Sequence, residues 1–252
     1  MQSLLTTIIH RPYVFLFLLS FFVIGVLNRG WTRTFLFLFL GYTIAFLSEF
    51  SSIRTGFPYG WYFYLYENLK GELLLGGVPV WDSLSYSFMA YASYEIAAWF
   101  TVYKKSPIAP LCQRGGGGIF SSTFLMVLLD IVTDPLAVRG DRWFLGKIFY
   151  YPHGGIYFGV PLSNFGGWFL VALCIFTSFT WLERKVPSPP PLRIPLLGPL
   201  FYGSIVFFNL LITLWIQEGK LALSGLLLQL VTFGTLKLFV PSSLLHQKKE
   251  PL

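Results

Sequence analysis

Residues 119–137, IFSSTFLMVLLDIVTDPLA, form an apolar run long enough to cross a membrane, yet the run carries two aspartates, Asp130 and Asp134. A membrane-spanning helix needs about 20 mostly apolar residues. A charged group in hydrocarbon costs roughly 2.5–3.5 kcal/mol on insertion scales. Further polar residues follow at 139–142 and within 157–168, YFGVPLSNFGGW. We therefore expect a membrane helix that ends in a polar cluster with a function.

The composition of the whole chain supports a membrane protein. Its 252 residues are 55% hydrophobic and only 12% charged, whereas soluble domains carry about 25% charged residues. We expect a single all-α integral membrane domain over residues 1–252. The net charge of +7 is typical of basic cytoplasmic loops, so nucleic-acid binding is not expected. The two cysteines, Cys112 and Cys174, are far apart, which argues against a zinc site or a disulfide framework.

Apolar runs predict a polytopic bundle of about seven spans. The first two lie so close together that six or eight spans remain possible, and the first is expected to be a retained helix instead of a cleaved signal. The expected spans cover residues 13–27, 34–50, 80–103, 119–137, 156–182, 197–216 and 221–240.

Loop charges predict the orientation of the bundle. One set of alternate loops is rich in basic residues, so the positive-inside rule makes it cytoplasmic, with the N-terminus outside and the C-terminus inside. These residues are Arg29, Arg33, Lys104, Lys105, Arg114, Arg184, Lys185, Arg193, Lys248 and Lys249. Acidic residues have little influence on topology, yet they gather on the other side: Glu49, Glu67, Glu72, Asp82, Asp130, Asp134 and Asp141.

Asp130 and Asp134 are four residues apart and should share one helix face. We expect Pro135 to end the helix at Asp134. Two neighbouring carboxylates repel when both are ionised and are costly to desolvate, so one is expected to keep its proton and could donate it. The structural alternative is that they pair with Arg139, Arg142 or Lys147.

Three further acidic residues lie in or beside the spans. Glu49 closes the second span, and Arg54 is a candidate ion-pair partner for it. Asp82 begins the third span, where the helix dipole favours an acid in the first turn. Glu95 lies thirteen residues further on, about 20 Å along a helix. It should face the bundle interior, where a structural hydrogen bond and a functional role both remain open.

The segment 157–168 adds polar groups and glycines. Asn164, beside Ser163, must find hydrogen bonds inside the bundle. Gly166 and Gly167 would let a neighbouring helix or a slender apolar ligand approach. The residues together predict an acidic, aromatic-lined cluster at the non-cytoplasmic end of an apolar bundle, suited to a lipid-like substrate. Nothing in them implies a metal ion or an organic cofactor.

Several of these blocks resemble the membrane carotenoid biosynthesis proteins, which include the bacterial CruF-type carotenoid hydratases and the archaeal bisanhydrobacterioruberin hydratases. The resemblance runs in order from Glu49 to Trp168, and the sequence after Trp143 departs from it. The matching blocks are Glu49, residues 54–56 (RTG), 58–60 (PYG) and 77–79 (GVP), Asp130 with Asp134-Pro135, and residues 157–168.

This resemblance implies a cofactor-free enzyme of a prokaryotic cell membrane that adds water across the terminal 1,2 double bond of an acyclic carotenoid. Its partners would be the polyene substrate and membrane lipid. Asp130 or Asp134 would act as the acid, the other aspartate and Glu49 would hold water, and Arg54 would keep one carboxylate ionised. The expected substrate-binding residues are Arg54, Asp82, Glu95, Trp143, Tyr157, Asn164 and Trp168.

Two other classes of function remain. The chain could bind a carotenoid or lipid without turnover, or it could be a transporter that uses Glu95 and Asp130 as a proton relay. Transporters often contain two halves with matching broken helices, and the sequence has no such repeat.

Overall fold

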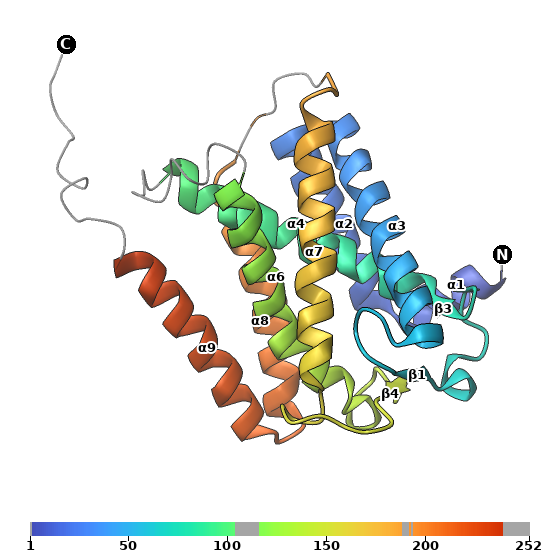
Figure 1. Cartoon of the computed structure of the whole chain (residues 1–252). Coiled ribbons are helices and arrows are strands. Elements are labelled where there is room, and N and C mark those ends of the chain that lie inside the picture. Colours follow the sequence, from blue (N-terminus) through green and yellow to red (C-terminus); the bar gives the residue numbers. More distant parts are fainter. Residues whose placement is uncertain (1, 104–115, 188–191, 193, 239–252) are drawn as a thin grey trace, which may run out of the picture.

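The computed structural model describes residues 2–103, 116–187, 192 and 194–238. Within these residues the chain forms eight α-helices and a few very short strands (Figure 1). The helices are α1 (Gln2–His10), α2 (Pro12–Arg29), α3 (Trp31–Thr55), α4 (Val80–Tyr103), α6 (Gly116–Ala137), α7 (Leu162–Glu183), α8 (Leu197–Trp215) and α9 (Gly219–Leu238).

Each of the seven predicted segments overlaps one of these helices, and five helices are long and apolar enough to cross a membrane. These five are α2, α3, α6, α7 and α8. The apolar part found in α9, Gly219–Thr235, is shorter. The last two residues of the predicted seventh segment, 239 and 240, lie outside the described residues, as do several of the basic loop residues that predict the orientation.

Helix α4 lies at the centre of the bundle and crosses it obliquely behind α6 and α7 in Figure 1. It packs against α2, α3, α6 and α8, and α9 lies outside against α6 and α8. Two buried serines of α4 donate to carbonyls of their own helix, Ser87 to Ser83 at 3.1 Å and Ser93 to Met89 at 3.0 Å. Gly41 of α3 lets the two helices approach closely at Ser87. Neighbouring helices thus surround the polar side chains of α4.

Two helix boundaries differ from the expectations. Helix α6 continues through Pro135 to Ala137 instead of ending at Asp134. Proline removes only one backbone donor, and the N–H of Val138 still reaches the carbonyl of Asp134 at 2.9 Å. Helix α7 begins at Leu162 instead of residue 156, because Pro161 is extended and residues 157–160 form a tight turn.

The loops at one end of the bundle contain short strands, which an all-α reading did not anticipate. Strand β1 (Phe63–Tyr64) pairs with β4 (Phe149–Tyr150) in antiparallel register, so the loop after α3 is joined to the loop after α6. Strands β2 (Leu74–Leu75) and β3 (Val78–Pro79) form a hairpin. In Figure 1, β1 and β4 lie at the lower end of the bundle, and β3 lies at its right-hand side next to α1.

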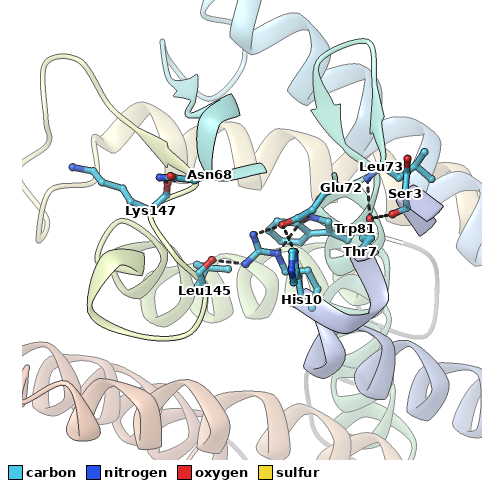
Figure 2. Close-up of polar contacts among 10 residues, drawn as sticks. Ser3, Thr7, His10, Asn68, Glu72, Leu73, Trp81, Leu145 and Lys147 are labelled. Carbon is cyan, nitrogen blue, oxygen red and sulfur yellow. Dashed lines mark hydrogen bonds and ion pairs between the residues drawn. The ribbon is translucent and has the colours of Figure 1, made fainter. Parts of the chain in front are cut away.

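A buried ion pair ties these loops to the beginning of α2. Arg11, between α1 and α2, binds both carboxylate oxygens of Glu72 at 2.7 and 3.2 Å. The indole of Trp81 donates to Glu72 at 2.6 Å, as Figure 2 shows, and the guanidinium of Arg11 lies 4.7 Å from the indole ring centre. Arg11 also donates to the carbonyl of Leu145. This network holds three separate segments of the chain together.

Candidate active site

The C-terminal ends of α3 and α6 and the beginnings of α4 and α7 meet next to the paired loops and enclose two cavities. The larger has a volume of about 120 Å³ and the smaller about 60 Å³. Both are lined by Glu49, Asp82, Tyr86, Asp134, Phe149 and Trp168. The two cavities therefore belong to one site.

One side of the site is built by α6 and α7. Asp130 and Asp134 lie one turn apart on α6, and the amide nitrogen of Asn164 on α7 donates to both, at 2.8 and 3.2 Å. The hydroxyl of Tyr151, just after β4, donates to the same oxygen of Asp134 at 2.7 Å. Asp134 therefore accepts two hydrogen bonds where Asp130 accepts one.

The other side is built by α3 and α4. The hydroxyl of Ser83 donates to Glu49 at 2.6 Å, and the hydroxyl of Tyr64 on β1 donates to Asp82 at 2.7 Å. Each side thus has one carboxylate held by a tyrosine of the paired loops. The strand pairing makes this possible, because it places the loop segments that carry Tyr64 and Tyr151 next to each other.

None of the ion pairs among the described residues involves Glu49, Asp82, Asp130 or Asp134. The basic residues that could have neutralised the aspartates are engaged elsewhere: Arg139 and Arg142 both pair with Glu218. Asp130 is fully buried, and its Oδ1 has no hydrogen-bond partner within the described part of the chain. An unpartnered buried polar atom is costly and marks a place where a ligand or water could bind.

Aromatic rings form most of the remaining walls. Tyr86 of α4 and Trp168 of α7 stack with ring centres 4.2 Å apart. Trp143 donates its indole N–H to the carbonyl of Leu136 at 3.1 Å, which fixes its ring beside the larger cavity. Rings of this kind attract a cation through their faces. The walls therefore suit an apolar molecule and also a transient positive charge.

Tyr64 and Tyr151, the loop tyrosines that donate to Asp82 and Asp134, stay neutral. Burial, and next the charge of Asp82, raises the pKa of Tyr64 well above its ordinary value. Burial, and next the charge of Asp134, does the same to the pKa of Tyr151. Both phenols therefore remain hydrogen-bond donors to their carboxylates near neutral pH.

The structure brings most of the predicted site residues together. Glu49, Asp82, Asp130, Asp134, Trp143 and Trp168 line the larger cavity, and Asn164 lines the smaller one. In the described part of the chain, no group of three or more His, Cys, Asp or Glu side chains is arranged to hold a metal ion.

Three predicted substrate-binding residues lie apart from the cavities. Arg54 is exposed and donates to the carbonyls of Phe50 and Gly76 at 3.0 and 2.9 Å, so the expected pair with Glu49 is absent and Ser83 takes its place. Tyr157 lies 3.3 Å from Ser224 of α9, hydroxyl to hydroxyl. Helix α7 starts at Leu162, later than expected, which leaves Tyr157 in the turn before this helix.

Glu95 is the third of these residues and lies far along α4 from Asp82. It binds Arg29 at 2.7 Å and Asn28 at 3.0 Å. Gly198 of α8 packs so closely that a Cβ there would lie 2.8 Å from the Cβ of Glu95. Of the two roles that the sequence left open, this geometry favours a structural one.

Sequence reasoning missed the partners that hold the carboxylates. Tyr64, Tyr151 and Ser83 were not predicted as site residues, and neither were the wall residues Tyr86 and Trp81. The only signal for them is the high density of aromatic residues in the two loops on the acid-rich side of the chain. An aromatic belt at the membrane interface produces the same signal.

Two comparisons relate the chain to known proteins. Residues 10–232 match the family described as "Carotenoid biosynthesis protein". A bisanhydrobacterioruberin hydratase from Haloarcula japonica is 29% identical over 184 residues, which cover 70% of this chain and 56% of that protein. The chain thus matches little more than half the length of this relative. No solved structure matches the chain.

Proposed function

Because the chain belongs to the carotenoid biosynthesis protein family, we propose that it is a membrane hydratase that adds water to the terminal 1,2 double bond of an acyclic carotenoid. The observation that carries this proposal is the state of Asp130. Its carboxyl group is fully buried beside an aromatic cavity, with one oxygen bound by Asn164 and the other without a partner among the described residues. Such a group can present a proton to an apolar ligand.

The reaction requires an acid that protonates an alkene, which is a poor base. In the proposed mechanism the proton of Asp130 moves to C2, and the π electrons of the double bond form the new C–H bond. This leaves a tertiary cation at C1. Water attacks C1 and loses one proton to a carboxylate, which returns the proton to Asp130. The sum is one water added and a tertiary alcohol formed, with the acid regenerated.

The assignment of Asp130 as the donor follows from the hydrogen bonds. Asp134 accepts from both Tyr151 and Asn164, and hydrogen bonds of this kind favour an ionised carboxylate. Asp134 is therefore proposed as the base that orients water and takes its proton. Glu49 and Asp82 on the opposite side would hold the water and share its proton. Each of these carboxylates is itself held by a hydroxyl donor, Glu49 by Ser83 and Asp82 by Tyr64.

The aromatic walls have two proposed tasks. Trp168 and Tyr86 lie beside the carboxylates and would stabilise the C1 cation, since a cation within about 6 Å of a ring centre is attracted to its face. Trp143, with Asn164 and Asp82, would position the carotenoid end. No role in binding is proposed for Arg54, Glu95 or Tyr157.

We also propose seven membrane spans, α2, α3, α4, α6, α7, α8 and α9, in the membrane of a prokaryotic cell, with the N-terminus outside and the C-terminus cytoplasmic. Helix α4 can be a span although it is less apolar than the five candidates, because its neighbours shield it from lipid. The active site would then lie at the non-cytoplasmic face. Labelling of single loop cysteines in intact cells, with a reagent that crosses the membrane and with one that does not, would test this orientation.

The function is tested by expression in a host that makes lycopene, followed by mass analysis of the pigments. We expect a product heavier by one water with the wild-type chain. Removal of a general acid typically costs 10²- to 10⁴-fold, so Asp130→Asn should lower the yield at least about a hundredfold. Asp141→Asn is the matched control, because Asp141 is an exposed aspartate outside the cavities.

Two outcomes would contradict the proposal. Unmodified pigment that copurifies with the wild-type protein would favour carotenoid binding without turnover. Full hydration by both Asp130→Asn and Asp134→Asn would reject these residues as the acid and base.

A further inference from the structure

The helices around α4 form a ring with one loose seam. Around the ring, α2 packs on α3, α3 on α7, α7 on α6, and α6 on α8. The ring closes where α8 meets α2, and these two helices share far less contact than the other neighbours do. The seam between α2 and α8 is therefore the place where the bundle can open at the least cost in packing.

The larger cavity extends to this seam. Tyr13 and Phe17 of α2 line it together with Phe208 and Asn209 of α8. Tyr13 and Phe208 stack across the seam, with ring centres 5.5 Å apart and an angle of 19° between the rings. Both rings are only partly buried, so each contacts the cavity on one side and the outside on the other. At this point the cavity wall is one side chain thick.

The outer surface at the seam is apolar. Leu16 of α2 is 63% exposed, and Phe207 and Leu211 of α8 are 66% and 51% exposed. In a membrane protein such a surface faces the hydrocarbon. Towards the loops the seam is covered by Trp143 and Phe144, whose rings contact Tyr13. Arg11 binds the carbonyl of the next residue, Leu145, and so fixes this cover.

The size of the cavity requires an opening of this kind. A volume of about 120 Å³ is close to the roughly 150 Å³ of an engineered cavity that holds one benzene. It can accept the end of a polyene but not the long remainder of the molecule. The remainder must leave the bundle, and its transfer into water would be unfavourable at roughly 25 cal/mol per Å² of apolar surface.

We propose that the carotenoid enters sideways from the membrane through the seam between α2 and α8. The stacked rings of Tyr13 and Phe208 form the gate, and during the reaction the unreacted part of the polyene lies between these rings and the lipid. This inference rests on the proposed hydratase function for its substrate. It assigns to Tyr13, Phe17 and Phe208 a binding role that the carboxylate site does not require.

The gate is tested by reversible cross-linking in isolated membranes. Tyr13→Cys and Phe208→Cys are combined in a chain that carries Cys112→Ser and Cys174→Ser, and the pair is bridged by a bifunctional thiol reagent that a reductant cleaves. The matched control is Val132→Cys with Gly225→Cys, which bridges α6 and α9. A Cβ at Gly225 would lie 3.1 Å from Cγ2 of Val132, and neither residue lines a described cavity.

We expect the bridge across the seam to lower the rate of lycopene hydration at least tenfold, and reduction to restore it. The bridge between α6 and α9 should change the rate less than twofold. Equal rates before and after bridging of Tyr13→Cys with Phe208→Cys would overturn the gate. A lack of hydration in the unbridged wild-type chain would instead overturn the proposed function.

A second comparison covers the case in which the cysteine pair is inactive before bridging. Phe208→Trp enlarges a ring at the gate, whereas Phe39→Trp enlarges an exposed ring of α3, away from the seam. We expect Phe208→Trp to raise the KM for lycopene at least fivefold with little change in kcat, and Phe39→Trp to change neither. Equal KM values for the two variants would overturn the gate.

Discussion

Asp130 and Asp134 each place a carboxylate oxygen within hydrogen-bond distance of one nitrogen, Nδ2 of Asn164, at 2.8 and 3.2 Å. One amide from α7 thus links the two aspartates of α6. Asp134 has a second donor in Tyr151, and Asp130 has none within the described residues. The two carboxyl groups therefore differ although they lie on the same helix face, and this difference underlies the proposed division into acid and base.

Tyr151→Phe tests the hydrogen bond that distinguishes the two aspartates. A hydrogen bond to a charged group contributes about 1.5–3 kcal/mol. Loss of the 2.7 Å bond to Asp134 should therefore lower lycopene hydration roughly ten- to hundredfold, since about 1.4 kcal/mol is one factor of ten. Tyr150→Phe is the control, because that neighbouring ring is 39% exposed and lines neither described cavity. Equal rates for the two variants would remove Tyr151 from the mechanism.

Gly167→Ala tests the close approach of the loop after α3 to α7. A Cβ at Gly167 would lie 2.5 Å from Cδ1 of Tyr59 and 2.8 Å from the carbonyl oxygen of Pro58. Overpacking of this kind typically costs 1–3 kcal/mol, so we expect a lower thermal stability in detergent and lower activity. Gly166→Ala is the control, because a Cβ there meets nothing within 4 Å. It should be neutral or slightly stabilising, and equal losses in both variants would contradict the described contact.

Arg11→Met tests the buried ion pair that ties the loops to α2. Arg11 is 3% exposed and Glu72 is 7% exposed, and removal of one partner of a buried pair costs about 3–5 kcal/mol. We expect a large drop in the thermal unfolding temperature in detergent, with partial recovery when Glu72→Leu is added. Arg54→Met should change stability by less than about 0.5 kcal/mol, because Arg54 is exposed. A small effect of Arg11→Met would show that the network contributes little to folding.

Alkaline pH tests the buried tyrosines of the loops. Burial, and next Asp82 for Tyr64 and Asp134 for Tyr151, raises both pKa values well above the ordinary value. In the unfolded chain these phenols ionise near pH 10, whereas in the folded chain they do not. Their contribution to stability is therefore complete below about pH 10 and decreases as the pH rises further.

We expect the unfolding temperature to fall above about pH 10, and to fall less steeply in the Tyr64→Phe, Tyr151→Phe double variant. Tyrosinate absorbance provides the direct measurement. The same titration midpoint in the folded and the denatured protein would contradict the burial of these phenols.

Much of the helical framework could be predicted from the sequence, because long apolar runs leave few alternatives to helices. The helix boundaries beside prolines are harder to predict, because the effect of a proline depends on the backbone hydrogen bonds around it. Pro135 did not end α6, since the backbone bond from Val138 to Asp134 still forms. Pro161 did delay the start of α7, which left Tyr157 outside the helix.

The partners of the charged residues could not be predicted in the same way. Arg54 is close to Glu49 in sequence, yet it bonds to two backbone carbonyls. Glu95 required a partner inside the bundle, but nothing in the sequence identified Arg29 and Asn28. Tyr64 and Tyr151 reach their carboxylates only because β1 and β4 pair, although 84 residues, 65–148, separate the two strands in the sequence.

Hydropathy and charge are properties of local segments, so an apolar helical bundle with a cluster of acids could be predicted from the order of the residues. The shared helix face of Asp130 and Asp134 could be predicted too, because spacing along a helix is a local property. The folded chain was needed to show which groups hold each carboxylate, that Oδ1 of Asp130 has no partner among the described residues, and that the ring of helices is loosest between α2 and α8. These features depend on the packing of segments far apart in the chain, which no local pattern records.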